Sequence, residues 1–182
     1  MSLRMRLEDL VPPKDDKRVL SFCGGICPGV RPFYVPVESR AGCLLARCFP
    51  NVEGIVRLRG GKLIQGWDIS QIPKIQLEAT WHAVWQQSRR EFVDVTPQES
   101  GQTRILFLPD VHRPHNGSLV PSRRFSLGDR ELVARYQAMS DEINKIRLDL
   151  WSAGFDQTHP VWRHRLGGLT TEISALRERL QK

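Results

Sequence analysis

The sequence has no apolar run approaching the roughly 18–20 residues that a membrane-spanning helix requires. The segment from Met1 to Arg6 is not followed by the apolar core of a secretory signal. A chain of 182 residues, 40% hydrophobic and 26% charged, has the composition of one folded domain with an appendage. We therefore expect a cytoplasmic protein with no membrane partner.

Long basic tracts are also missing, although the formal net charge is +7. Basic residues come in pairs, such as Arg89-Arg90 and Arg123-Arg124, and aromatic residues do not alternate with them. A surface that stacks nucleic-acid bases combines both features. Gly24-Gly25 and Gly60-Gly61 lie in neither a GxxxxGK[ST] nor a GxGxxG frame. We expect no nucleic-acid partner and no nucleotide or other cofactor.

Cysteine is absent after the first third of the chain, where all four cysteines lie: Cys23, Cys27, Cys43 and Cys48. In a reducing compartment such residues are buried, catalytic or metal-bound more often than disulfide-linked. Four thiols suffice for a structural Zn²⁺. The spacings Cys23-x3-Cys27 and Cys43-x4-Cys48, however, are wider than the usual two-residue zinc knuckle. A zinc site would also occupy Cys48 and exclude it as a nucleophile.

A second set of possible metal ligands comprises Asp110, His112 and His115. Carboxylate and imidazole groups bind divalent metals. The surrounding proline and glycine predict a loop, in which histidines are usually unliganded. We therefore expect no metal here.

The first 40 residues are rich in proline and glycine, which predicts loops and short extended segments wrapped on a core. Residues 33–37 form a candidate strand, and Pro36 places it at a sheet edge. The apolar spacing of residues 51–58 predicts a short helix, because Pro50 suits a first helical turn. This helix would directly follow Cys48.

Four further strands are predicted because each run is bounded by turn-forming residues: 62–67, 75–86, 91–96 and 104–108. Short connections between consecutive strands imply a largely antiparallel sheet of about four or five strands. Alternation along 75–86 places His82 on the more polar face with Glu78 and Thr80, opposite Trp81 and Trp85.

From about residue 126 apolar residues follow the heptad rhythm: Leu132, Tyr136, Met139, Ile143, Ile146 and Leu150, then Trp162, Leu166, Leu169, Ile173, Leu176 and Leu180. Two seams of matched length joined by a short turn predict an antiparallel helical hairpin. The expected fold is α+β, with a core over residues 1–125 and the hairpin over 126–182. The hairpin could also form a homodimer.

A candidate pair of catalytic side chains lies on neighbouring strands. If residues 86–90 form the loop, Trp85 faces Glu91 and His82 lies directly opposite Asp94. The carboxylate would then accept a hydrogen bond from Nδ1–H of the imidazole and leave Nε2 free as a base. A slip of one residue would break this pairing.

Cys48 is the preferred nucleophile, because a helix N-terminus and a nearby imidazole both favour the thiolate. A helix-borne cysteine followed by a strand-borne histidine and an acidic residue on the next strand is the order of papain-like hydrolases. Cys43 is the alternative nucleophile, since the helix-compatible run 44–47 follows it.

The segments His82-Ala83-Val84-Trp85 and Val93-Asp94-Val95-Thr96-Pro97 resemble the histidine–aspartate strand pair of transglutaminase-like proteins. The chain also resembles a group of uncharacterised bacterial proteins that combine these elements with Gly66-Trp67 and a Cys-x-x-Asn-Val element, here residues 48–52. The likeness covers residues 43–110. It lacks the aromatic-rich nucleophile motif of transglutaminases, and Val84 and Asp94-Val95 replace the usual residues.

These patterns predict a cysteine-nucleophile hydrolase or acyl-transferase that acts on an amide or ester bond of a protein or peptide. Cys48, His82 and Asp94 would be the nucleophile, the base and the orienting acid. The alternative is a non-catalytic binding or adaptor module, in which Cys48 and His82 are structural residues and the N-terminal cysteines can hold zinc.

Overall fold

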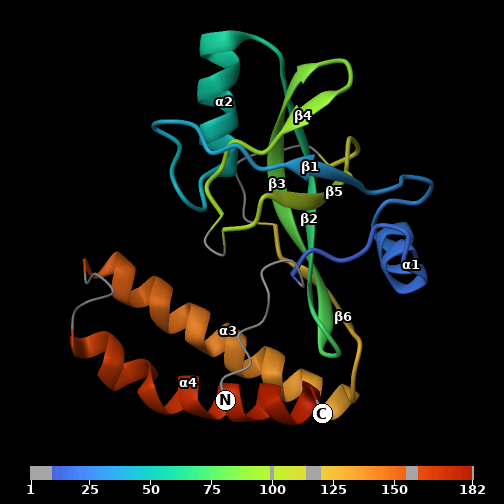
Figure 1. The fold of residues 1–182 in the computed structure, drawn as a ribbon. Helices are drawn as coiled ribbons and strands as arrows, with labels where there is room; N and C mark the ends of the chain where they lie inside the picture. The colour runs from blue at the N-terminus through green and yellow to red at the C-terminus, as the bar shows by residue number, and fades with distance from the viewer. Residues whose placement is uncertain (1–9, 99–100, 114–119, 155–159, 182) are drawn as a thin grey trace. The chain divides into compact units, whose positions relative to one another are not determined.

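The computed structural model describes residues 10–98, 101–113, 120–154 and 160–181 (Figure 1). The fold is α+β, as the sequence predicts, and its elements in chain order are α1 (Lys17–Ile26), β1 (Phe33–Pro36), α2 (Cys48–Arg59), β2 (Lys62–Ile72), β3 (Gln76–Ser88), β4 (Glu91–Val93), β5 (Arg104–Pro109), β6 (Arg123–Ser126), α3 (Arg130–Ser152) and α4 (Pro160–Gln181). Among these described residues no helix is both long and apolar enough to cross a bilayer.

The chain divides into two compact units. One contains Met1–Ile72 and Leu77–Phe125, and the other contains Pro73–Gln76 and Ser126–Lys182. The first unit carries most of the sheet and all three predicted catalytic residues. The second carries the helix pair and the turn between β2 and β3.

The sheet has the strand order β1-β5-β2-β3-β4, with β6 also paired to β3. β1 is an outer strand of this order, as Pro36 predicts. The chain just after β1 nevertheless bridges the chain just after β4. Asp94 N–H donates to Pro36 O, and Glu38 N–H donates to Asp94 O, each at 2.9 Å. The sheet therefore curls until its two ends meet.

A small core lies on one face of the curled sheet. Val35, Val84, Ile105 and Phe107 pack together and are fully buried. Asp68 lies opposite Phe107 in the β2–β5 register, and His82 alternates with Val84 along β3. Both polar side chains therefore share the face of this core.

Helix α1 was not predicted, so the expectation of loops throughout residues 1–40 is wrong. Asp16 caps the helix, because its Oδ1 accepts hydrogen bonds from the N–H groups of Arg18 and Val19 at 2.7 and 3.3 Å. Val19 and Cys23, four residues apart, are the buried residues. The nearby Gly24-Gly25 masked this short apolar spacing. Strand β6 was also missed, since its sequence is mainly polar.

In the second unit, α3 and α4 run side by side in opposite directions (Figure 1). Ile143, Leu150 and Leu166 form their buried core, and Arg135 forms an ion pair with Glu172. The heptad seams thus face each other within one hairpin. Self-association through these helices stays a prediction.

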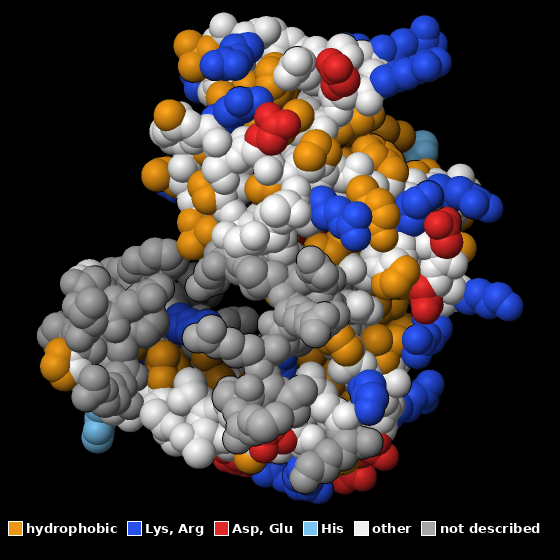
Figure 2. Space-filling view, viewed as in Figure 1, with side chains coloured by type: hydrophobic (Ala, Val, Ile, Leu, Met, Phe, Trp, Pro, Cys, Tyr) orange, Lys and Arg blue, Asp and Glu red, His pale blue; other side chains and the backbone are white. Residues whose placement is uncertain are grey.

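Basic side chains are scattered over the face seen in Figure 2, singly and in small groups, among hydrophobic and acidic ones. This distribution fits the paired basic residues of the sequence. The drawn face carries no continuous basic strip among the residues coloured by type.

Gly66→Ala should destabilise the protein strongly. A Cβ at Gly66 would clash with Leu108 O and would lie 2.7 Å from Cζ of Phe107. Neither neighbour can yield without moving β5 or the core, so we expect a loss of about 1–3 kcal/mol or more. Urea unfolding followed by tryptophan fluorescence measures the change.

Gly54→Ala in α2 is the matched control, because no atom lies within 4 Å of its added Cβ. This substitution should stabilise the helix by up to about 1 kcal/mol. Equal losses in both variants would contradict the close approach of β2 and β5 at Gly66.

Candidate active site

Cys48 is the first residue of α2, three residues earlier than the predicted helix begins. Its backbone N–H belongs to the first turn, where no intrahelical carbonyl is available as acceptor. Arg47 precedes the helix and makes no side-chain capping bond. The half-buried thiol therefore lies at a helix N-terminus, where the helix dipole favours a negative charge.

Asn51 fixes the loop that leads into Cys48. Its Oδ1 accepts a hydrogen bond from Leu44 N–H at 3.0 Å, and its Nδ2 donates to Leu44 O at 2.7 Å. The same Nδ2 donates to Thr96 Oγ1 at 3.2 Å. Ala46 in this loop has a φ of 56°, a left-handed conformation that costs a non-glycine residue of order 1 kcal/mol. Asn51 thus holds a strained loop beside the thiol, a role that sequence reasoning missed.

The expected register between the strands of His82 and Asp94 is wrong. Trp85 lies opposite Val93, not Glu91, and a bulge follows between Gln86 and Ser88. The pairing is therefore shifted by two residues. Because side chains alternate with a period of two, this shift keeps Asp94 on the face of His82 as a diagonal neighbour.

The imidazole and the carboxylate nevertheless meet. His82 Nε2 lies 3.1 Å from Asp94 Oδ2. The ring N–H is not aligned for a straight hydrogen bond, so the contact is an ion pair. The sequence predicted that Nδ1 would face Asp94 and that Nε2 would act as the base. In the structure Nε2 faces Asp94, which leaves Nδ1 for the Cys48 thiol.

Asp94 is fully buried and its carboxylate is held on several sides. Oδ1 accepts a hydrogen bond from Thr96 N–H at 2.9 Å, and Oδ2 accepts one from Gln98 Nε2 at 2.7 Å. A buried carboxylate needs such donors because it has lost its water. The three sequence-predicted residues Cys48, His82 and Asp94 therefore form one connected chain.

The electrostatics of Cys48 and His82 favour a charged pair. Burial opposes ionisation of the thiol, but a hydrogen bond from His82, its positive charge and the N–H groups of Ala83 and Phe49 outweigh burial, so the pKa of Cys48 is lowered. Burial likewise opposes charging of His82. Asp94 and Cys48 overcome it and hold the pKa of His82 well above its ordinary value. This arrangement favours a thiolate beside an imidazolium.

Asp68 is a fourth titratable group of the site, and sequence reasoning assigned it no role. Burial raises the pKa of its carboxyl to about 6; the positive charge of His82 opposes this shift and the negative charge of Asp94 adds to it. The signal available in the sequence was an acid between two large apolar residues of a strand, Trp67 and Ile69. Its place depends on the β2–β3 pairing, which brings residues far apart in sequence to the same face.

The described residues contain no group of three or more His, Cys, Asp or Glu side chains placed to hold a metal ion. Cys23 lies on α1 and Cys27 directly follows the helix, and burial raises the pKa of each thiol to about 11. All four cysteines are free. The alternative of a zinc site built from these four cysteines therefore has no support among the described residues.

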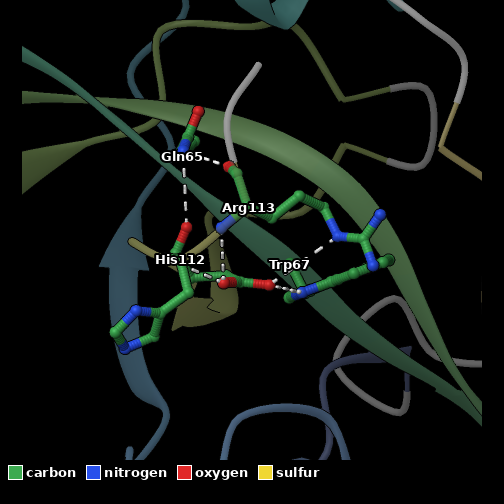
Figure 3. Close-up of polar contacts among 5 residues, drawn as sticks. Gln65, Trp67, His112 and Arg113 are labelled. Atoms are coloured by element: carbon green, nitrogen blue, oxygen red, sulfur yellow. Dashed lines mark hydrogen bonds and ion pairs between the residues drawn. The ribbon is translucent and has the colours of Figure 1, made fainter. Parts of the chain in front are cut away.

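Asp110 has other partners than a metal. It accepts a hydrogen bond from Trp67 Nε1 at 3.1 Å and caps the turn at His112 (Figure 3). The His112 side chain is exposed, and His115 lies outside the described residues. Of the two candidate nucleophiles, Cys48 is the one whose thiol interacts with His82.

Comparison with protein-family models, curated proteins and solved structures finds no match to this chain. The resemblance to transglutaminase-like proteins therefore stays a prediction. The function of this chain is therefore inferred from the geometry of Cys48, His82 and Asp94.

Cys48 should react with iodoacetamide at lower pH than an ordinary thiol, because its pKa is lowered by His82. In His82→Ala the half-maximal rate should move to higher pH, since the imidazolium is lost. Mass spectrometry of peptides after timed alkylation measures each cysteine separately. Cys23 and Cys27, with pKa values of about 11, serve as internal controls and should stay unmodified. An unchanged profile in His82→Ala would contradict the thiolate–imidazolium pair.

Asp68→Asn should stabilise the protein at pH 8 and have little effect at pH 4. The folded-state pKa of about 6 exceeds the unfolded value, so the ionised carboxylate destabilises the fold only above that range. At pH 4 the folded protein already carries the neutral acid. Thermal unfolding at both pH values tests this, and 1 kcal/mol corresponds to about 2–4 °C in a chain of this size. A gain at pH 4 equal to that at pH 8 would exclude ionisation as the cause.

Proposed function

We propose that the protein is a cysteine-nucleophile hydrolase or acyl-transferase acting on an amide or ester bond of a protein or peptide. One observation carries this proposal. The Cys48 thiol is hydrogen-bonded to His82, whose far nitrogen lies 3.1 Å from the buried Asp94 carboxylate. Nucleophile, base and orienting acid in this order are the groups that acyl transfer through a thioester requires.

In the first half of the reaction the Cys48 thiolate attacks the carbonyl carbon and forms the C–S bond. The carbonyl oxygen becomes an oxyanion, which the Cys48 backbone N–H at the helix start can stabilise. The His82 imidazolium gives its Nδ1 proton to the leaving amine or alkoxide as the bond to the carbonyl carbon breaks. An acyl-enzyme thioester and a neutral imidazole remain.

In the second half His82 takes a proton from water, or from an acceptor amine, as that molecule attacks the thioester. The C–S bond then breaks, the acid or new amide leaves, and the thiolate–imidazolium pair is restored. Asp94 orients the ring through its contact with Nε2. Its own bonds to Thr96 and Gln98 keep it in place.

The loop before Cys48 supports an apolar substrate group on one side of the scissile bond. Leu44 and Leu45 are 60% and 44% exposed, which is high for leucine, and Asn51 holds Leu44 in place through both of its backbone groups. Fixed apolar side chains close to a nucleophile suit recognition of an apolar residue. We place the reaction in the cytoplasm, where four free thiols stay reduced.

Turnover should fall by about 10²–10⁴-fold in His82→Ala, because general acid–base catalysis contributes that much, and should vanish in Cys48→Ala. A panel of fluorogenic peptide amides and aryl esters, with and without an acceptor amine, supplies the assay. Cys43→Ala is the matched control and should keep full activity, since His82 interacts with Cys48.

Activity that survives His82→Ala on a confirmed substrate would contradict this mechanism. Loss of activity in Cys43→Ala but not in Cys48→Ala would transfer the nucleophile to the other cysteine. A panel that gives no turnover, together with unreactive Cys48, would leave the adaptor module as the better account.

A further inference from the structure

A second cluster in the first unit lies on the other side of the sheet. Trp67 of β2 and Trp81 of β3 are 1% and 9% exposed, and their rings meet edge to face with centroids 5.1 Å apart. Each tryptophan precedes a site residue, Asp68 and His82 respectively. Because neighbouring residues of a strand point to opposite faces, the tryptophans and the proposed active site lie on opposite sides of β2 and β3.

Two arginines converge on this pair of rings. Cζ of Arg113 lies 5.7 Å from the Trp67 centroid and 6.0 Å from the Trp81 centroid, and Cζ of Arg123 lies 5.9 Å from Trp67. Figure 3 shows the Arg113 side chain lying along the Trp67 ring. Cation–π attraction accounts for a guanidinium above an indole. It does not account for two like charges gathered on the same ring.

Asp110 supplies negative charge to the cluster, but less than the two arginines require. Its Oδ2 accepts a hydrogen bond from Trp67 Nε1 and lies 4.0 Å from Arg113 Nε. Its Oδ1 accepts hydrogen bonds from the backbone N–H groups of His112 and Arg113. The neighbouring Cys27 thiol, with a pKa raised to about 11, is neutral at physiological pH. Among these residues one positive charge is left over.

Two buried donors of the cluster also lack an acceptor. Among the residues that the structure describes, neither Trp81 Nε1 nor Arg113 Nε has a hydrogen-bond partner. A buried donor left without an acceptor is costly and therefore rare, and a bound ion or molecule is one explanation for it. Both orphaned atoms are N–H donors, and the species that would satisfy them must therefore be an acceptor. Arg123 is exposed and the Arg113 side chain is 41% exposed, so solvent reaches the cluster.

We propose that Trp81 Nε1, Arg113 and Arg123 form a binding site for a small oxoanion, a carboxylate or a phosphate group. The excess positive charge favours an anion and the unpaired donors favour a hydrogen-bond acceptor, and an oxoanion is both. Guanidinium groups bind both oxoanions through paired N–H donors, and the indole N–H adds a fixed third donor. The site is separate from Cys48 and does not depend on the proposed reaction.

The indole N–H resonances of the ¹⁵N-labelled full chain test this site directly. Inorganic phosphate and acetate are titrated separately at constant ionic strength set with NaCl. The Trp81 Nε1–H peak, assigned with Trp81→Phe, should shift and saturate at millimolar anion. The Trp85 Nε1–H donates to Gly60 O at 2.9 Å and should stay unmoved as the internal control.

Arg123→Gln should weaken anion binding at least tenfold without affecting folding, because Arg123 is exposed. The matched variant Arg57→Gln removes the same charge from an exposed position on α2 and should bind as tightly as the native chain. Tighter binding of phosphate than of acetate identifies a phosphate site, and the reverse order identifies a carboxylate site.

A Trp81 peak that does not move, or that shifts linearly without saturation, would overturn the proposal. So would equal weakening in Arg57→Gln and Arg123→Gln, because attraction by net charge would then explain the binding. Each of these measurements is independent of any catalytic assay.

Discussion

The buried Asp94 ties the fold and the candidate site together. Its backbone joins the two ends of the sheet through Pro36 and Glu38, and its carboxylate meets His82 on the inner face. A fully buried carboxylate is stable only when charged or polar donors replace its water. Thr96, Gln98 and His82 supply those donors. The same residue, Asp94, therefore both closes the sheet and orients the imidazole.

This constraint explains the charge state of the whole cluster. Asp94 and Cys48 raise the pKa of His82, and the imidazolium in turn lowers the pKa of the Cys48 thiol. One imidazolium thus lies beside two acidic groups. A third anion at Asp68 finds little compensation, which is why burial and Asp94 prevail over His82 and raise its pKa to about 6. Of the carboxyl groups in the cluster, Asp68 is therefore the one whose pKa is raised toward neutrality.

The parts of the fold that depend on residues close together in the sequence could be predicted. The heptad spacing marks α3 and α4, and alternation places His82 opposite Trp81 in β3. The register could not be predicted, because the bulge between Gln86 and Ser88 depends on tertiary packing. The predicted and observed registers differ by two residues, an even number, which keeps Asp94 on the same face of the sheet as His82. The predicted contact between the two side chains therefore survives the error. Asp68 and Asn51 needed knowledge of partners from other elements, which no window of the sequence contains.

The two faces of β2 and β3 also differ in the balance of charge among their polar groups. On the inner face the carboxylate of Asp94 accepts hydrogen bonds from Thr96 and Gln98 and contacts His82, so its partners all come from the protein itself. On the outer face the donors of Trp81 and Arg113 have no acceptor, and the charges of Arg113 and Arg123 exceed that of Asp110. Several contacts within the protein suit a carboxylate that must stay fixed during a reaction. The outer cluster is open to solvent at two arginines and has an excess of positive charge, which suits residues that bind a ligand. Because side chains alternate along a strand, the hairpin of β2 and β3 can carry the candidate active site on one face and the proposed anion site on the other without contact between the two sites.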